Sequence, residues 1–222
     1  MSEGKMEGVC YTIGYADLPS GIFLDRIKEN AIETIIDVRS SPYSAYQNQY
    51  NREVIKRFLN NNQIEYIFCG DKIGGRYTDP KLLYADGVVN YENVRERVEF
   101  QHGIDVLIDL IREGRKICLM CSEKLPEKCH RFILVSRELQ NRGVRVLHIV
   151  PDVGLISNEE LEEKQIKEMF DAGQKPLFGN QSDTRERLYR ELNQSYGYRV
   201  SLESNETGRK DESKKGTQET LF

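Results

Sequence analysis

The feature that most constrains the fold is a regular alternation of short apolar runs with segments of helical spacing. Five runs rich in Val, Ile and Leu are each followed by a polar or amphipathic stretch. Alternation of this kind predicts a parallel sheet covered by helices on both faces. We therefore predict an α/β fold, a three-layer sandwich with a mostly parallel five-stranded sheet. The expected strands are residues 9–13, 34–38, 64–69, 116–121 and 144–150.

Helices are expected between these strands and after the last one. Ser20 is the predicted N-cap of the first helix. Pro126 is the predicted first residue of a later helix, because its missing N–H costs nothing in the first turn. Residues 70–90 contain several glycines and are predicted to be mostly loop. The expected helical segments are residues 21–30, 51–61, 94–113, 126–141, 159–170 and 184–193.

The length of 222 residues suits one domain with an appendage. We predict a domain over residues 1–200, with a core at about 9–150 and a helical C-terminal extension at 151–200. Residues 201–222 are polar with few apolar side chains, and a disordered tail is expected there.

The composition limits where the protein is expected to act and what it is expected to bind. No apolar run approaches the roughly 20 residues that span a bilayer, and residues 1–9 lack the apolar part of a signal peptide. No membrane partner and a cytoplasmic location are therefore expected. Five cysteines, an odd number, argue against a disulfide framework. The net charge of −4 does not indicate a nucleic-acid binder overall, although a local basic patch remains open.

The segment from Cys118 to Arg131 has the highest density of chemically active side chains. Cys121 is expected at a strand end, and Cys129 and His130 near the start of the next helix. The field of a helix start lowers the pKa of a thiol and raises its nucleophilicity. Cys121 or Cys129 is therefore a candidate nucleophile, with Glu123 or His130 handling protons. Alternatively, Cys118 and Cys121 are small core residues, and His130 and Arg131 face the solvent.

A metal site in this segment is not predicted. Zinc ligands are usually paired at separations of two to four residues, whereas seven residues lie between Cys121 and Cys129. Adjacent Cys129 and His130 are also expected to have difficulty reaching one ion. A fourth ligand would have to be Cys69 or His148. No cofactor is identified by the sequence.

Three further loops follow predicted strands and carry groups suited to anions. Asp37, Arg39 and Ser40 follow one strand, and the alternative there is an internal Asp–Arg ion pair. Glycines in the other loops let the backbone approach a ligand or simply turn. Because carboxyl ends of parallel strands share one edge, these loops converge if their strands are neighbours. The candidate ligand-binding residues are Gly14, Tyr15, Asp37, Arg39, Ser40, Gly74, Gly75, Arg76 and Arg131.

The last five residues form a compact apolar anchor after a polar segment. Gln218, Leu221 and Phe222 look like the short peptides that dock in the hydrophobic pocket of bacterial sliding clamps. Gln174, Leu177 and Phe178 repeat the pattern, where a loop packed on the domain is expected instead. A sliding clamp is thus a candidate partner of the C-terminus.

Five segments that follow one another along the chain read together as one pattern. They are Thr12–Tyr15, Asp37–Arg39 with Pro42, Gly74–Arg76, Cys121–Glu123 with Cys129–Arg131, and His148–Ile149. This series resembles the DUF488 family, a prokaryotic domain of unknown function, over about residues 9–200. The family commonly carries His at the position of Tyr15, so a proton-transfer role there would be altered or lost in this chain. The resemblance implies an α/β fold and assigns no reaction.

Taken together, the sequence predicts a phosphate-bearing ligand, a nucleotide or nucleic-acid component, bound at the C-terminal edge of the sheet. Arg39, Arg76 and Arg131 are the expected anion-binding residues, and cysteine chemistry is the expected reactivity. Three other hypotheses stay open. These are rhodanese-like sulfur transfer, a non-enzymatic nucleic-acid binding module, and an adaptor recruited by a sliding clamp.

Overall fold

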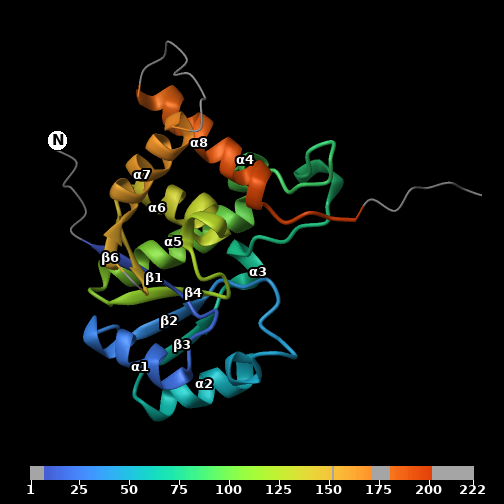
Figure 1. Cartoon of the computed structure of the whole chain (residues 1–222). Helices are drawn as coiled ribbons and strands as arrows, with labels where there is room; N and C mark the ends of the chain where they lie inside the picture. The colour runs from blue at the N-terminus through green and yellow to red at the C-terminus, as the bar shows by residue number, and fades with distance from the viewer. Residues whose placement is uncertain (1–7, 152, 172–180, 202–222) are drawn as a thin grey trace, which may run out of the picture.

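The fold is built on a six-stranded sheet with the strand order β3-β2-β4-β1-β5-β6. The computed structural model describes residues 8–151, 153–171 and 181–201. The sheet crosses the middle of the molecule, with α1 and α2 on one side and α5, α6 and α7 on the other (Figure 1). The strands are β1 (Val9–Gly14), β2 (Thr34–Asp37), β3 (Glu65–Phe68), β4 (Ile117–Cys121), β5 (Arg145–Val150) and β6 (Gly154–Ser157).

The predicted α/β class and mostly parallel sheet are confirmed. Strands β1 to β5 pair with one another in parallel. The edge strand β6 pairs antiparallel with β5. The prediction of five strands was wrong by this one edge strand. Gly154–Ser157 is short and only partly buried, so it lacks the apolar run that identifies a buried strand.

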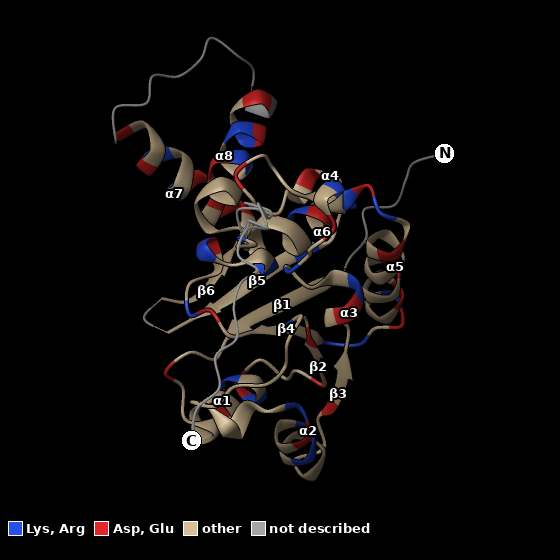
Figure 2. Ribbon diagram, turned by 90° about the vertical axis from the view of Figure 1, so that its right-hand side faces the viewer, with Lys and Arg blue, Asp and Glu red and all other residues tan. Residues whose placement is uncertain are grey.

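Side chains of the central strands alternate between two apolar clusters. Ile13, Ile35 and Met120 lie in a cluster with residues of α1 and α2. Ile36 and Leu119, one residue along their strands, lie in a second cluster with residues of α5 and α6. This period of two is the expected geometry of a strand buried on both faces. Figure 2 shows the charged residues mainly on the outer helices and loops, away from these strands.

Most predicted helices are present with small shifts at their ends. Residues 94–113 form the end of one helix and all of the next, because the chain turns at Glu96 and Arg97. The prediction of Ser20 as the N-cap was wrong by one residue, because Ser20 is the first helical residue and Pro19 takes the N-cap position. The helices are α1 (Ser20–Glu29), α2 (Arg52–Asn61), α3 (Gly70–Ile73), α4 (Tyr91–Arg95), α5 (Val98–Arg112), α6 (Arg137–Asn141), α7 (Asn158–Asp171) and α8 (Gln181–Tyr196), with short 3₁₀ turns η1 (Asn48–Tyr50) and η2 (Pro80–Leu82).

The prediction of one helix from Pro126 was wrong. Pro126 begins only a 3₁₀ turn, η3 (Pro126–Lys128), and Cys129 then has an extended backbone, with φ of −133° and ψ of 143°. A π-helix, η4 (Arg131–Ser136), leads into α6. The Ser136 hydroxyl donates a hydrogen bond of 2.6 Å to the Arg131 carbonyl. Cys129 therefore lies before this helix, and its thiol is not in the first turn.

The C-terminal helices contribute to the core as well as to the outer surface. Leu188 and Tyr189 of α8 are almost fully buried in the same cluster as α5 and α6. Arg137, also buried, forms ion pairs with Glu92 of α4 and Glu186 of α8. After α8 the chain returns to the loop before α4, where the Val89 N–H donates to the Tyr198 carbonyl at 2.9 Å.

Three sequence predictions fall outside the described residues, except for residue 201 of the last. These are the repeat at Gln174, Leu177 and Phe178, the clamp-binding peptide at Gln218, Leu221 and Phe222, and the expected disordered tail at residues 201–222. Within the described ranges, no helix has the length and apolar character needed to cross a bilayer.

Candidate functional site

The loops that carry the predicted site residues meet at one edge of the sheet. Strands β3, β2, β4 and β1 are successive neighbours. Gly14 pairs with Cys121, and Asp37 pairs with Met120, so the strands end at nearly the same level. The carboxyl edge of an open parallel sheet is where such folds usually place ligands. The condition for convergence of these loops, that their strands be neighbours, is therefore met.

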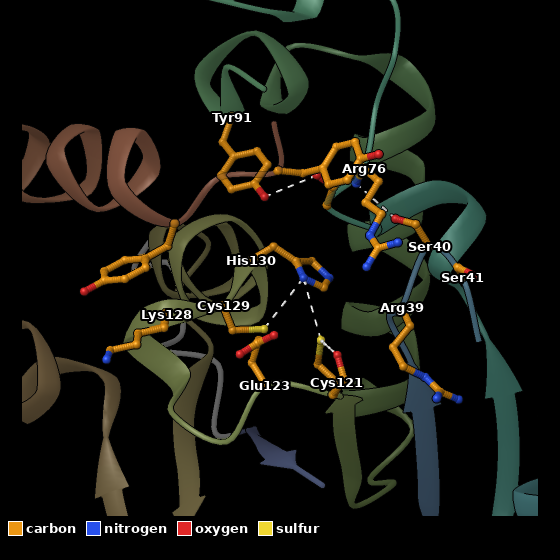
Figure 3. Close-up of a pocket in the computed structure, with 14 residues that line it drawn as sticks. Arg39, Ser40, Ser41, Arg76, Tyr91, Cys121, Glu123, Lys128, Cys129 and His130 are labelled. Atoms are coloured by element: carbon orange, nitrogen blue, oxygen red, sulfur yellow. Dashed lines mark hydrogen bonds between the residues drawn. The ribbon is translucent and has the colours of Figure 1, made fainter. Parts of the chain in front are cut away.

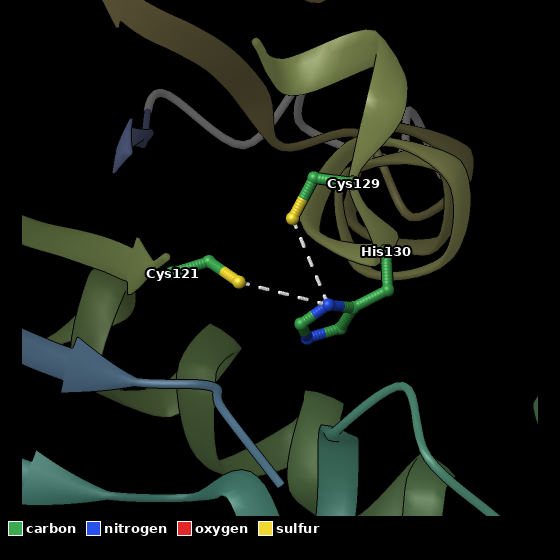
Figure 4. Close-up of side chains that lie close together, drawn as sticks. All are labelled: Cys121, Cys129 and His130. Atoms are coloured by element: carbon green, nitrogen blue, oxygen red, sulfur yellow. Dashed lines mark hydrogen bonds between the residues drawn. The ribbon is translucent and has the colours of Figure 1, made fainter. Parts of the chain in front are cut away.

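Two thiols and one imidazole converge at the end of β4 (Figure 4). The His130 Nδ1 atom lies 3.8 Å from the Cys121 Sγ and 3.7 Å from the Cys129 Sγ. All three atoms lie within 4.8 Å of one another. Both cysteines are at most 5% exposed. We call Cys121, Cys129 and His130 the triad.

The imidazole of the triad is oriented by the backbone. The His130 Nε2 atom lies 2.9 Å from the Val38 carbonyl oxygen, which can only accept. The hydrogen must therefore be on Nε2, and the Nδ1 of a neutral ring can accept from a thiol. Gly75 packs on the same ring, and a Cβ there would lie 2.8 Å from His130 Cβ and Cγ. A glycine is needed at this position for the ring to approach.

The pKa values of the two thiols are shifted in opposite directions. The hydrogen bond from Cys129 lowers the pKa of the Cys121 thiol well below its usual range, with His130 and Arg131 adding to this against the effect of burial. Burial raises the pKa of the Cys129 thiol well above its usual range, and the hydrogen bond to Cys121 adds to this rise. Cys121 is therefore the more acidic thiol of the pair.

The triad lines a pocket of about 180 Å³. Figure 3 shows its labelled side chains converging from several elements. The sequence did not identify six of the lining residues. Lys128 lies inside the segment already singled out, but Tyr196 and Tyr198 are about 70 residues away along the chain and had no local signal. The six residues are Ser41, Tyr91, Ser122, Lys128, Tyr196 and Tyr198.

Asp37 and Arg39 form the buried ion pair that was the alternative prediction for this loop. Arg39 Nε and Nη2 donate to the two carboxylate oxygens of Asp37 at 2.8 and 2.6 Å. Nη1 donates to the Tyr15 hydroxyl at 2.6 Å, and Nη2 also reaches the Tyr50 carbonyl. Arg39 lines the pocket, but its guanidinium is 4% exposed and mostly engaged by these partners. It fixes the loop after β2.

Tyr15 lies beneath this ion pair. Its ring stacks on Tyr50 with centroids 4.0 Å apart, and it is 3% exposed. Burial raises the pKa of its hydroxyl, partly offset by Arg39. Tyr15 does not line the pocket. Its position favours a structural role in orienting Arg39 over proton transfer to a ligand.

Arg76 is an exposed cation that lines the pocket. Its backbone N–H donates to the Ser40 Oγ at 3.0 Å, which joins the loops after β2 and β3. Its guanidinium lies 5.2 Å from the centre of the Tyr198 ring. A Cβ on Gly74 would lie 2.2 Å from the Ser40 Oγ, so glycine permits this junction. Arg76 forms no salt bridge with any described residue, and its charge is available to an anion.

Arg131 lies away from the pocket. It is 1% exposed, and its two Nη atoms donate to the carbonyls of Glu123 and Lys124 at 2.6 and 3.1 Å. Gly14 belongs to the same junction, because a Cβ there would lie 1.8 Å from the Glu123 carbonyl. These contacts favour structural roles for Arg131 and Gly14 over the predicted contact with an anion. The Glu123 side chain, by contrast, is exposed and lines the pocket.

The sequence model of the domain of unknown function DUF488 matches residues 21–137. The match covers 117 of the 222 residues, just over half of the chain. This chain belongs to the DUF488 family. A comparison with curated proteins found no match.

The DUF488 match contains the triad and Arg76 but not the whole pocket. The pocket residues Tyr196 and Tyr198 follow the matched residues. Gly14 and Tyr15, which the sequence predicted as site residues but which do not line the pocket, precede them. The matched stretch is narrower than the predicted resemblance over residues 9–200. The DUF488 domain therefore supplies the thiols and the histidine, and a later part of the chain supplies the aromatic side chains at the pocket.

Proposed function

We propose that the pocket binds the phosphate group of a small ligand such as a nucleotide, and that Cys121 attacks the bound ligand as a thiol nucleophile. The observation that carries the proposal is the position of His130 Nδ1, 3.8 Å from the Cys121 sulfur, with the other ring nitrogen held by the Val38 carbonyl. A nucleophile beside an oriented base is the arrangement that thiol catalysis needs.

Cations and short donors support binding of an anion. Arg76 and Lys128 are exposed side chains that line the pocket, and Ser40 and Ser41 line it as well. A guanidinium binds phosphate oxygens in a bidentate manner, and hydroxyls add short hydrogen bonds. The Glu123 carboxylate opposes anions, which favours a ligand whose phosphate sits toward Arg76.

The size of the pocket supports a phosphate group rather than a whole nucleotide inside it. A volume of about 180 Å³ is smaller than the roughly 300–1,000 Å³ of typical ligand pockets. The rest of the ligand would extend over the rim, where Tyr196 and Tyr198 are 42% and 37% exposed. Aromatic rings at that place suit stacking on a base.

The proposed chemistry balances on the triad. His130 Nδ1 takes the proton of the Cys121 thiol, and the sulfur forms a bond to the electrophilic atom of the ligand. The bond from that atom to its leaving group breaks, and the leaving group takes its electron pair and the proton from His130.

Two measurements test the proposal. Calorimetry with inorganic phosphate and adenosine monophosphate is expected to show binding that weakens about tenfold in Arg76→Ala, the loss of one charge-assisted contact. Arg112→Ala is the control, because Arg112 is an exposed arginine of α5 outside the pocket. Iodoacetamide is expected to modify Cys121 faster in the wild type than in His130→Ala. Equal phosphate binding in both arginine variants, or equal alkylation rates, would contradict the respective half of the proposal.

Sulfur transfer is a second candidate, and the position of Cys129 favours it. A Cys121 thiolate can attack the outer sulfur of a persulfide donor, which leaves a Cys121 persulfide and a donor thiolate. Cys129 can then attack the inner sulfur, releasing hydrosulfide and forming a Cys121–Cys129 disulfide. Mass spectrometry after incubation with a persulfide donor tests this. The wild type is expected to show the Cys121 persulfide or the Cys121–Cys129 disulfide, and Cys121→Ser is expected to show neither. A wild-type protein with neither modification would remove this candidate.

A further inference from the structure

The triad has a second use that goes beyond the proposed function. We infer that Cys121, Cys129 and His130 form a Zn²⁺ site with three protein ligands and a fourth position open to the pocket. The sequence argued against such a site because neighbouring Cys129 and His130 were expected not to reach one ion. The extended backbone of Cys129 removes that obstacle, since both side chains point to the same place (Figure 4).

The distances between the donor atoms suit a tetrahedral ion. Zn–S bonds of about 2.3 Å and Zn–N bonds of about 2.0–2.1 Å place S and N donors about 3.6 Å apart in a tetrahedron. The two measured S···N distances are 3.8 and 3.7 Å. An ion could therefore enter with only small movements of the side chains.

The second contact of His130 is one that zinc-bound histidines commonly make. A metal-bound imidazole almost always donates its other N–H to a carboxylate, a carbonyl or water, which fixes the ring and its tautomer. His130 Nε2 makes this contact with the Val38 carbonyl at 2.9 Å. The lone pair of Nδ1 is thereby directed at the two sulfurs. This observation is independent of the distances within the triad.

The ligand set selects the ion and its coordination. Two thiolates and an imidazole are soft and borderline donors that suit Zn²⁺. Zn²⁺ displaces the thiol protons, so two thiolates and one Zn²⁺ together carry no net charge in a buried place. Neither Cys69 nor His148 belongs to the triad. The two ring nitrogens of His148 are instead engaged in hydrogen bonds with the Thr12 and Asn158 side chains. With three protein ligands, the fourth position is left to water or to an anion in the pocket.

Zinc binding and the proposed nucleophilic role exclude each other in one molecule. Both use the same electron pairs of the Cys121 sulfur. Loading with Zn²⁺ therefore holds the thiol in an unreactive state. This makes the two proposals separable by experiment, because thiol reactivity of the metal-free chain does not depend on any metal affinity.

The test uses the full chain, freed of metal with a chelator and titrated with Co²⁺ and then Zn²⁺. One Co²⁺ per chain is expected, with the intense visible bands of tetrahedral cobalt and thiolate-to-metal bands in the near ultraviolet. Zn²⁺ should displace it. Cys121→Ser, Cys129→Ser and His130→Ala should each lower the affinity by ~100-fold or more, at or beyond the upper end of second-shell effects. Cys69→Ser, which changes a buried thiol outside the triad, should leave it unchanged.

A second measurement needs no variant. Zn²⁺ should protect Cys121 and Cys129 of the wild type from iodoacetamide, and a chelator should restore their modification. The inference is overturned if the wild type takes up no Co²⁺ or Zn²⁺, if all three triad variants bind as the wild type does, or if Zn²⁺ gives no protection. Rapid alkylation of Cys121 in the metal-free protein would still support the nucleophilic role in each of these cases.

Discussion

At the scale of single residues, burial keeps the His148 side chain in its neutral form. His148 of β5 is 1% exposed, and its Nδ1 lies 2.8 Å from the Thr12 hydroxyl. Its Nε2 lies 3.0 Å from the Asn158 Oδ1. These partners satisfy a neutral ring, and burial lowers the pKa of His148 to about 3. The segment containing His148 carried the family resemblance, and the structure gives it a place in the core.

The low pKa of His148 predicts a loss of stability in mild acid. The His148 side chain binds a proton near pH 6.5 in the unfolded chain but only near pH 3 in the folded chain. Protonation therefore favours the unfolded chain below pH 6.5, and the stability that neutral His148 provides at higher pH is lost as the pH falls toward 3. Between pH 7 and 5 the free energy of unfolding should fall by about 2 kcal/mol. Urea unfolding at both pH values measures this.

His148→Gln should remove most of that pH dependence, since an amide can still bond to both partners without titrating. His102→Gln, a change on the exposed surface of α5, should retain it. The same pH dependence in His148→Gln as in the wild type would show that another group is responsible.

At the scale of elements, the site depends on how closely the loop after β3 approaches His130, at the start of the η4 helix. Gly75 lies between the His130 ring and the Tyr91 hydroxyl, which donates to the Gly75 carbonyl at 3.2 Å. The loop after β3 and the segment before η4 are thus in contact at a residue without a side chain. The position of the imidazole relative to both thiols depends on this contact.

Gly75→Ala is expected to move His130 and to destabilise the fold. The added methyl would meet His130 Cβ and Cγ at 2.8 Å and the Tyr91 hydroxyl at 2.9 Å, and overpacking of this kind costs roughly 1–3 kcal/mol. Alkylation of Cys121 should slow at the same time. Thermal unfolding and iodoacetamide kinetics measure the two effects.

Gly21→Ala is the matched control. Nothing lies within 4 Å of a Cβ at that position in α1, and alanine favours a helix. This variant should be as stable as the wild type or slightly more stable, with unchanged thiol kinetics. A Gly75→Ala protein with the same properties would mean that the contact does not position the imidazole.

The sequence predicted elements where burial is uniform and failed where tertiary contacts decide. The segment Ile117–Cys121 is buried at every position and reads as a strand. The edge strand β6 has no buried position. The π-helix at Arg131–Ser136 depends on the Arg131 side chain binding the preceding loop and on the Ser136 hydroxyl. Spacing alone could place Arg131 near the thiols but could not give the direction of its guanidinium.

At the scale of the whole molecule, the C-terminal helices and the sheet share one core. Leu188 and Tyr189 of α8 belong to the cluster that includes Phe132 and Leu119. The Tyr189 ring lies 5.4 Å from that of Phe132. Residues of the predicted core and of the predicted C-terminal extension therefore share one apolar cluster, and we expect both parts to unfold together.

Leu188→Ala tests this cooperativity. Leu188 is 2% exposed, and truncation of a buried leucine costs about 2–5 kcal/mol. Circular dichroism in the far ultraviolet and tyrosine absorbance should report the same single transition at a lower midpoint. Val98→Ala, at a position 80% exposed, should leave the midpoint nearly unchanged. A separate early transition, with the main midpoint unmoved, would show that α8 unfolds alone.

The pairing of Tyr198 with Val89 brings the end of the described chain to the pocket. The 21 residues from 202 to 222 are therefore attached a few residues from the ligand site. Fully extended they reach at most about 70 Å. A partner bound to Gln218, Leu221 and Phe222 would be tethered to the pocket within that distance. The attachment point alone would then couple what the C-terminus binds to what the pocket receives.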